Sequence, residues 1–301
     1  MSKNKNTNRL DNERSIAKLM QEIQKQDFEN VDQLNEFMKK MQGRSLHDMP
    51  KSTTDKGRSQ DLVIQAYDET ATKGKKLIKQ ALELDPDNAD AYNYLASLET
   101  DVDKALALFS QAVEAGERAL GEEFIKDEKG HFWGLIETRP YMRAKSGVAD
   151  CLYAKNRISG AIEVYREMIE LNPNDNQGVR YLLATILLSK KDLSDYESFI
   201  NNYEGEDSAV WHYNNALYHF KKMGKSAKSD TELLKAYKFN PHVMEFMLGL
   251  KELPKEMPQF IGRGDENEAA AYIFDAIHTW GQTDGDLDWM HEFLMEKRKT
   301  N

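Results

Sequence analysis

Cysteine is nearly absent from this chain, because Cys151 is the only one in 301 residues. A single thiol cannot form an intrachain disulfide framework or a zinc site made of several thiolates. Cys151 precedes Leu152 within a helical pattern, which favours a buried, unreactive thiol over a nucleophile. We therefore expect a reducing compartment, no metal site and no cofactor.

Long apolar runs are also missing. The longest, 181–188, contains one Thr and falls far short of the roughly 20 residues that span a bilayer. Residues 1–8 contain no apolar stretch of the kind found in secretory signals. These absences predict a cytoplasmic protein without a membrane segment.

The charge is negative overall and unevenly distributed. The net charge is -10, although residues 1–60 contain 12 Lys and Arg against 9 Asp and Glu, so the remainder is strongly acidic. An acidic surface repels a phosphate backbone and releases no counterions on contact with it. Direct binding of nucleic acid by the main part of the chain is therefore disfavoured.

The first sixty residues contain two helical patterns. The spacing of Ile16, Met20 and Ile23 predicts one short amphipathic helix, and that of Val31 and Met38 predicts another. The next stretch, 43–56, mixes Ser, Thr, Gly and Pro without any period. Such a composition predicts a linker.

Beyond the linker, helical patterns end repeatedly in similar short sequences. These are LELDP at 82–86, IELNP at 169–173 and KFNP at 238–241. Proline lacks the amide proton that a helix needs and clashes with the preceding turn, so each of these sequences marks the end of a helix. Recurrence of this kind is typical of an array of helix pairs.

These positions resemble the tetratricopeptide repeat, a helix pair with small residues at its crossing point and Pro after its second helix. The best match, 142–173, places Ala149 and Ala161 where the paired helices cross and Tyr165 between neighbouring repeats. The resemblance implies an all-α fold, a right-handed α-solenoid of such helix pairs, with Tyr165 in its core. We predict this array at 58–250. A polar leader, two short amphipathic helices and a linker would precede it at 1–57, and capping helices would follow at 251–301.

Two further segments, 130–144 and 172–178, resemble a group of uncharacterised bacterial tetratricopeptide proteins. Some members of that group carry a Cys-rich tail that chelates zinc. This chain has no such tail, so we do not transfer the zinc site to it. The resemblance therefore suggests a family and a fold but no activity.

In such repeats the first helix of each pair lines a concave groove, and the resemblance implies ligand contacts at recurring positions along it. Arginines there can bind a carboxylate through two hydrogen bonds, asparagines can hold peptide amides, and aromatic side chains can anchor a partner. The Lys and Asn pattern of chaperone-tail receptors is absent. The candidate partner-binding residues are Asn93, Arg143, Asp150, Arg180, Trp211, Asn214 and Tyr218.

A second candidate cluster lies in the irregular insertion 130–143. It consists of His131, Trp133, Glu137 and Arg139, which together offer a base, an acid and a clamp for an anion. Aromatic residues at an imperfect junction between repeats more often fill a gap, with polar neighbours pairing locally. We therefore favour a structural role for this cluster over a catalytic one.

Three functions remain open. The leading hypothesis is a non-catalytic adaptor that binds a peptide or a helix of another protein in the groove, with a homodimer also allowed. One alternative is a regulatory protein whose N-terminal helices bind a second partner while the array senses a peptide. A less favoured alternative is a hydrolase that uses the 130–143 insertion.

Overall fold

The computed structural model describes residues 5–24, 28, 30–41, 52–258 and 260–300. These residues form helices joined by turns and contain no strand. Residues 42–51, which make up most of the predicted linker, lie outside the described residues. The chain divides into two compact units, residues 1–176 and 177–301, which we call unit 1 and unit 2.

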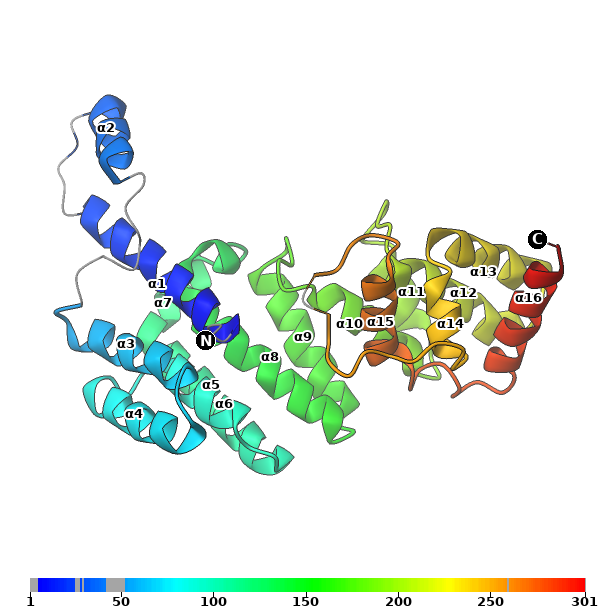
Figure 1. The fold of residues 1–301 in the computed structure, drawn as a ribbon, viewed down its shortest axis with the longest axis horizontal. Coiled ribbons are helices and arrows are strands. Elements are labelled where there is room, and N and C mark those ends of the chain that lie inside the picture. Colours follow the sequence, from blue (N-terminus) through cyan, green and yellow to red (C-terminus); the bar gives the residue numbers. More distant parts are fainter. Residues whose placement is uncertain (1–4, 25–27, 29, 42–51, 259, 301) are drawn as a thin grey trace. The chain divides into compact units, whose positions relative to one another are not determined.

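Unit 1 is built around three helix pairs, α3–α4, α5–α6 and α8–α9, and α5 and α6 also pack on α8 (Figure 1). Two single turns of 3-10 helix, η2 and η3, precede α8. Its elements are α1 (Lys5–Gln24), α2 (Val31–Met41), α3 (Asp55–Tyr67), α4 (Ala71–Leu84), α5 (Ala89–Ser97), α6 (Val102–Leu120), α7 (Glu122–Asp127), η2 (Phe132–Gly134), η3 (Ile136–Thr138), α8 (Arg139–Ala154) and α9 (Ile158–Leu171).

Unit 2 contains the pairs α10–α11 and α12–α13, and α15 packs on α10, α12 and α14. Its elements are α10 (Val179–Ser189), α11 (Ser194–Ile200), α12 (Ala209–Met223), α13 (Ala227–Phe239), α14 (His242–Met247), α15 (Glu266–Ala276) and α16 (Asp286–Thr300). The all-α fold with helices packed in pairs, as in an α-solenoid, is thus confirmed.

Small side chains set the distance between paired helices, as the sequence predicted. Ala149 and Ala161 are fully buried, and Tyr165 is 1% exposed. A close approach also lies between α8 and α6, where a Cβ on Gly147 would stand 2.4 Å from the ring of Phe109. Close packing of this kind leaves no room for an added methyl group.

The repeated segments that end in Pro mark the end of one helix, and the next helix begins a few residues later. α4 ends at Leu84, two residues before Pro86, and Asn88 caps α5 by accepting a hydrogen bond from the Ala91 amide at 3.2 Å. Asp265 caps α15 in the same way through the Glu268 amide at 2.8 Å. An Asn or Asp at this position satisfies an amide that the helix itself leaves unpaired.

The N-terminal helix differs from the prediction. α1 begins at Lys5, well before Ile16, and buries Leu10 and Glu13 while Ile16 and Met20 are 40% and 54% exposed. The face that docks therefore carries Leu10 together with polar side chains such as Glu13, and the surface it meets is charged. The domain boundaries predicted near residues 57 and 250 stay a prediction. The division into two compact units falls at a different place, after residue 176.

Candidate functional site

Arg143, on the second turn of α8, lies at the centre of a group of buried charges in unit 1. Its Nε and Nη2 donate to Asp90 Oδ1 and Oδ2 at 3.0 and 2.8 Å. Its Nη1 donates to both carboxylate oxygens of Glu13, at 3.2 and 2.9 Å. Arg139 Nη1 stands 3.5 Å from Glu13 Oε1. We call Glu13, Asp90, Arg139 and Arg143 the charge cluster.

Asp90 is the most deeply buried member, at 1% exposed, and side chains of α3 and of its own helix α5 support it. Gln60 Nε2 of α3 donates to its Oδ2 at 3.0 Å, and Asn93 Nδ2 donates to its Oδ1 at 3.3 Å. Burial alone raises the pKa of Asp90, but the charge of Arg143 and the hydrogen bonds from Arg143, Gln60 and Asn93 outweigh it, so the pKa lies below its usual value. Asp90 is therefore a permanent anion at neutral pH.

The pKa of Arg143 is shifted upward in turn. Burial lowers it, whereas the charges of Asp90 and Glu13 and their hydrogen bonds raise it above its usual value. A bidentate arginine held between two carboxylates has fixed geometry as well as fixed charge. Arg143 is therefore suited to binding carboxylates. Because it stays charged, it does not act as a general acid.

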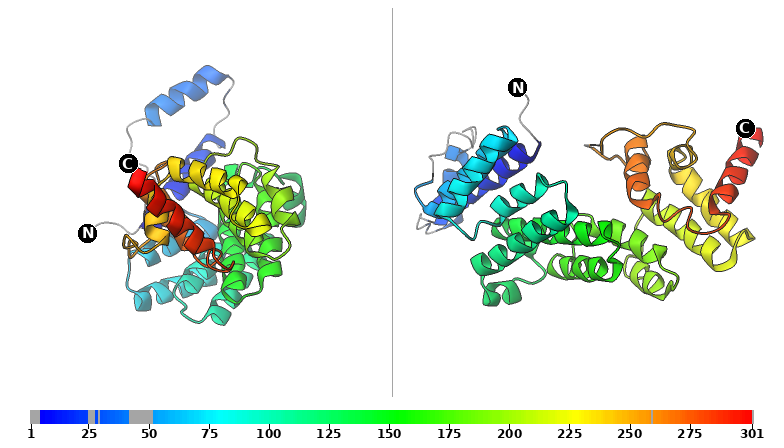
Figure 2. Two further views of the ribbon diagram at one scale, coloured as in Figure 1. Left: turned by 90° about the vertical axis from the view of Figure 1, so that its right-hand side faces the viewer. Right: turned by 90° about the horizontal axis from the view of Figure 1, so that it is seen from below.

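One member of the charge cluster, Glu13, comes from α1, which lies beside α3 in unit 1 (Figures 1 and 2). Leu10 and Glu13 are 1% and 7% exposed, and the Arg14 guanidinium donates to Asp61 of α3. We call the surface formed by α3, α5 and α8 under α1 the inner surface of unit 1. It contains Asn93 and Arg143, which the sequence singled out, but its occupant is a helix of the same chain.

Asp90 makes the stability of unit 1 dependent on pH. Because its pKa is lower in the folded chain than the ordinary value of 3.8, its contribution is complete above that value and is lost as the pH falls through the folded pKa. In urea titrations between about pH 7 and about pH 3, we expect the difference in unfolding free energy between wild type and Asp90→Asn to shrink at the acid end. A difference that stays constant across this range would show that Asp90 is not held as an anion.

The candidate residues of unit 2 are engaged within that unit. The Arg180 guanidinium lies over the rings of Tyr181 and Tyr203, at 4.9 and 5.7 Å, and its Nε is 3.3 Å from Glu206 Oε2. The Trp211 ring meets the same two tyrosines edge to face, each at 5.7 Å. Arg180 and Trp211 are thus brought together, in a small aromatic and ionic cluster.

Asn214 is 1% exposed and belongs to a buried chain of hydrogen bonds. Its Nδ2 donates to Thr185 Oγ1 at 3.0 Å, and its Oδ1 accepts from the Tyr272 hydroxyl of α15 at 2.9 Å. Tyr272 in turn accepts from Trp280 Nε1 at 2.7 Å. The amide predicted to hold a peptide therefore holds α15.

The two remaining groove candidates make local contacts. The Tyr218 hydroxyl donates to Glu197 of α11 and accepts from Lys222 Nζ at 3.0 Å. Asp150 has an exposed side chain and accepts a hydrogen bond from the Tyr165 hydroxyl. The partner-binding role of all seven candidates stays a prediction.

The 130–143 insertion forms η2, η3 and the start of α8. Arg139 Nε donates to the Trp133 carbonyl at 3.1 Å, and its guanidinium lies 5.2 Å from the centroid of the Trp133 ring. His131 and Glu137 have exposed side chains. Phe132, between these groups, is fully buried and fills the junction. Within this insertion, Arg139 belongs to the charge cluster through its contact with Glu13. His131 is exposed and is not a member of the cluster.

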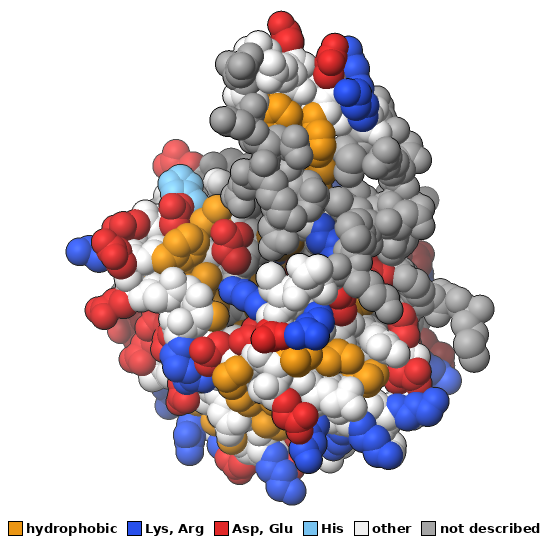
Figure 3. Space-filling view, turned by 90° about the vertical axis from the view of Figure 1, so that its left-hand side faces the viewer, with side chains coloured by type: hydrophobic (Ala, Val, Ile, Leu, Met, Phe, Trp, Pro, Cys, Tyr) orange, Lys and Arg blue, Asp and Glu red, His pale blue; other side chains and the backbone are white. Residues whose placement is uncertain are grey.

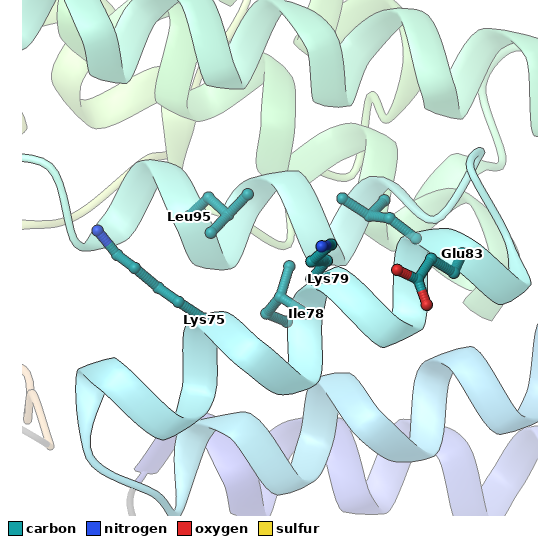
Figure 4. A pocket seen from close by; sticks show the side chains of 6 residues that line it. Lys75, Ile78, Lys79, Glu83 and Leu95 are labelled. Atoms are coloured by element: carbon teal, nitrogen blue, oxygen red, sulfur yellow. The ribbon is translucent and has the colours of Figure 1, made fainter.

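A surface hollow of about 370 Å³ lies between α4 and α5 (Figure 4). Its floor consists of Ile78, Leu82 and Leu95, and the exposed side chains of Lys75 and Lys79 stand at its rim. Figure 3 shows that apolar side chains on this end of unit 1 form small patches crossed by charged ones. The hollow offers apolar contact, whereas the charge cluster offers directional contact.

In the described part of the chain, no three His, Cys, Asp or Glu side chains come together in a way that could hold a metal ion. Cys151 is 7% exposed, and burial raises the pKa of its thiol, which disfavours the reactive thiolate. None of the described helices combines the length and the apolar content needed to cross a bilayer.

Comparison with known proteins decides the family. A family model described as ST7 protein matches residues 45–297. The chain belongs to the ST7 family. The range that matches the ST7 model contains Asp90 and Arg143 but not α1, so the inner surface of unit 1 is part of the matched region and its occupant is not.

Curated relatives support this assignment to the ST7 family. The human protein named Suppressor of tumorigenicity 7 protein-like is 28% identical over 260 residues, which cover 78% of this chain and 45% of that protein. The Gallus gallus protein of the same name is 27% identical over 273 residues, covering 79% of this chain and 47% of its own length. Suppressor of tumorigenicity 7 protein of Macaca fascicularis is 26% identical over 233 residues, with coverages of 70% and 43%. The chain thus spans less than half the length of these relatives.

The family suggested by the sequence was wrong. The match is to the ST7 family and to animal proteins, not to the tetratricopeptide family or to a bacterial group. Small residues at helix crossings and a Pro after a helix are required wherever short helices pack closely in pairs. These positions therefore indicated the fold correctly and carried no information that separates one such family from another.

Sequence reasoning also missed Glu13. It identified Arg143 as a residue that binds a carboxylate, but it placed that carboxylate on another protein. A glutamate within a polar helix has no local signal that distinguishes a buried ion pair from a solvated charge. Only the packing of α1 shows which of the many acidic residues of the chain Arg143 meets.

Proposed function

We propose that this chain is a non-catalytic protein-interaction module that binds a helical segment of another protein on the inner surface of unit 1. The observation that carries the proposal is that this surface already holds a helix, α1, through the Glu13 carboxylate and Arg143. A surface that fits one amphipathic helix supplies the geometry for others.

Charge and burial support a binding role over a catalytic one. The donors of Arg143 are directed at carboxylates of two different helices, α5 and α1, so the side chain acts as a clamp between elements. In the insertion considered for hydrolysis, Arg139 stacks on Trp133, while His131 and Glu137 extend from exposed positions. A general base must instead be held within hydrogen-bonding reach of its target.

Supplying α1 as a separate peptide tests the proposal. A labelled peptide of residues 5–24 is titrated into a chain that lacks residues 1–24, and fluorescence anisotropy reports binding. We expect saturable one-to-one binding. Glu13→Gln in the peptide should weaken it by about tenfold or more, because Arg143 loses one of its two carboxylates.

The control for this titration is Asn12→Lys in the same peptide. It changes the peptide charge by the same amount as Glu13→Gln, at a position that is exposed in α1. It should therefore bind like the unmodified peptide. Absence of saturable binding, by a truncated chain whose circular dichroism still shows the helical content, would reject the proposed function.

A regulatory role for the N-terminal helices is the second candidate, and one observation favours it. In α2, Val31 and Met38 are 69% and 41% exposed, and the Phe37 ring packs on that of Phe28 at 5.6 Å. Apolar side chains on an amphipathic helix offer contact to a second partner. This role would place that partner on α2.

A further inference from the structure

The contacts of α1 define a short recognition pattern. Leu10, Glu13 and Arg14 are spaced i, i+3 and i+4, so they lie on one face of the helix. Leu10 is buried, Glu13 meets Arg143, and Arg14 meets Asp61 of α3. The three side chains thus contribute an apolar contact, a buried anion and a cation, each with its own counterpart on the inner surface.

The inner surface discriminates between charges at each of these places. A basic residue in place of Glu13 would lie against both Arg139 and Arg143, and an acidic residue in place of Arg14 would lie against Asp61. Like charges forced together at a desolvated contact are strongly disfavoured. The surface therefore selects the order of the charges along a helix as well as its apolar residue.

α1 is not an ideal occupant of this surface. Among the described residues, Arg14 Nη2 is buried without a hydrogen-bond partner, which weakens the docking of α1. Two apolar residues of the helix, Ile16 and Met20, stay exposed. Docking through one buried leucine and a few polar contacts, with Ile16 and Met20 left in solvent, is an arrangement that a competing helix can replace.

The tether raises the local concentration of α1. About thirty residues join the end of α1 at Gln24 to the start of α3 at Asp55. Because α1 and the inner surface belong to one chain, the docking of α1 is intramolecular, and this connection rather than the amount of free peptide sets its effective concentration. A free helix of the same intrinsic affinity therefore has to overcome this advantage before it binds.

From these contacts we infer that α1 is a tethered competitor for the partner of unit 1. The partner is an amphipathic helix that carries an apolar residue, a carboxylate three positions later and a basic residue directly after it. The inference rests on the proposed function, since it names the regulation and the partner class of the same surface. Binding requires the release of α1, and weakening the hold on α1 opens the surface.

The test uses the full chain and the labelled peptide of residues 5–24. Two variants each remove one docking contact of α1 and leave the surface intact: Glu13→Gln and Arg14→Gln. We expect both variant chains to bind the peptide about tenfold more tightly than wild type, because the internal competitor is weakened. Asn12→Lys and Asn12→Asp, which change the charge by the same amounts at an exposed position, should bind like wild type.

The outcomes separate this inference from the proposed function. Equal affinity of wild type and both variants, whether weak or strong, would overturn the inference. If the chain lacking residues 1–24 nevertheless binds the peptide, the inner surface still recognises helices and the proposed function stands. If that chain does not bind either, both proposals fail. Circular dichroism of each variant confirms that the helices are retained, and the two variants act at separate contacts.

Discussion

Replacement of Arg143 by Met is expected to lower the unfolding free energy by about 3–5 kcal/mol, because it leaves Asp90 and Glu13 buried without their cation. Met keeps most of the length of the side chain, so the loss reports charge rather than volume. Urea unfolding followed by circular dichroism measures the change. The loss should exceed that of any other single ion-pair variant in unit 1.

Two comparisons separate this effect from a general loss of positive charge. Arg118→Gln breaks an exposed pair with Asp87 and should leave the unfolding midpoint close to that of wild type. A triple variant, Arg143→Met with Asp90→Asn and Glu13→Gln, should recover part of the lost stability, because no buried charge remains unpaired. An Arg143→Met variant as stable as Arg118→Gln would mean that the charge cluster is hydrated rather than buried.

Truncation of Tyr165 to Ala is expected to cost about 3–5 kcal/mol, since it opens a cavity between packed helices. Tyr165 is 1% exposed and its hydroxyl donates to Asp150. Tyr165→Phe keeps the ring and removes only that hydrogen bond, so it should cost about 1 kcal/mol. Thermal and urea unfolding of both variants separates packing from hydrogen bonding.

An aromatic residue outside the core provides the reference. Phe260 is 82% exposed, and its replacement by Ala should change the midpoint little. If Tyr165→Ala were as mild as Phe260→Ala, the ring of Tyr165 would not fill a core position. In that case the close packing of α8 on α9 would need another explanation.

The sequence predicted Arg143 as a ligand for a carboxylate, and the structure places it against two. The chemistry of the guanidinium made this inference possible, because its planar donors fit carboxylates and it is always charged. The partner was not predictable, because Glu13 and Asp90 are far apart in sequence from Arg143. For Asn214 the predicted ligand was a peptide, whereas in the structure its side-chain amide binds Tyr272 inside unit 2.

The surfaces that α1 and α15 cover differ from the open groove that the repeat pattern implied. In unit 1, α1 supplies Glu13 to Arg143, and in unit 2, α15 supplies Tyr272 to Asn214. In the helix pairs, periodicity identified core residues such as Tyr165, but it did not show what covers the inward-facing side chains. A helix that lies on such a surface can come from any part of the chain or from another protein.

The sequence by itself determined the all-α fold with helices packed in pairs and the core positions Ala149, Ala161 and Tyr165. These features depend on local spacing and on side-chain size, which can be read along the chain. Only the tertiary structure decided that Arg143 meets Glu13 and Asp90, and that α1 docks through Leu10 and Glu13. Ion pairs between distant segments depend on how helices lie in space, and no period in the sequence encodes that arrangement.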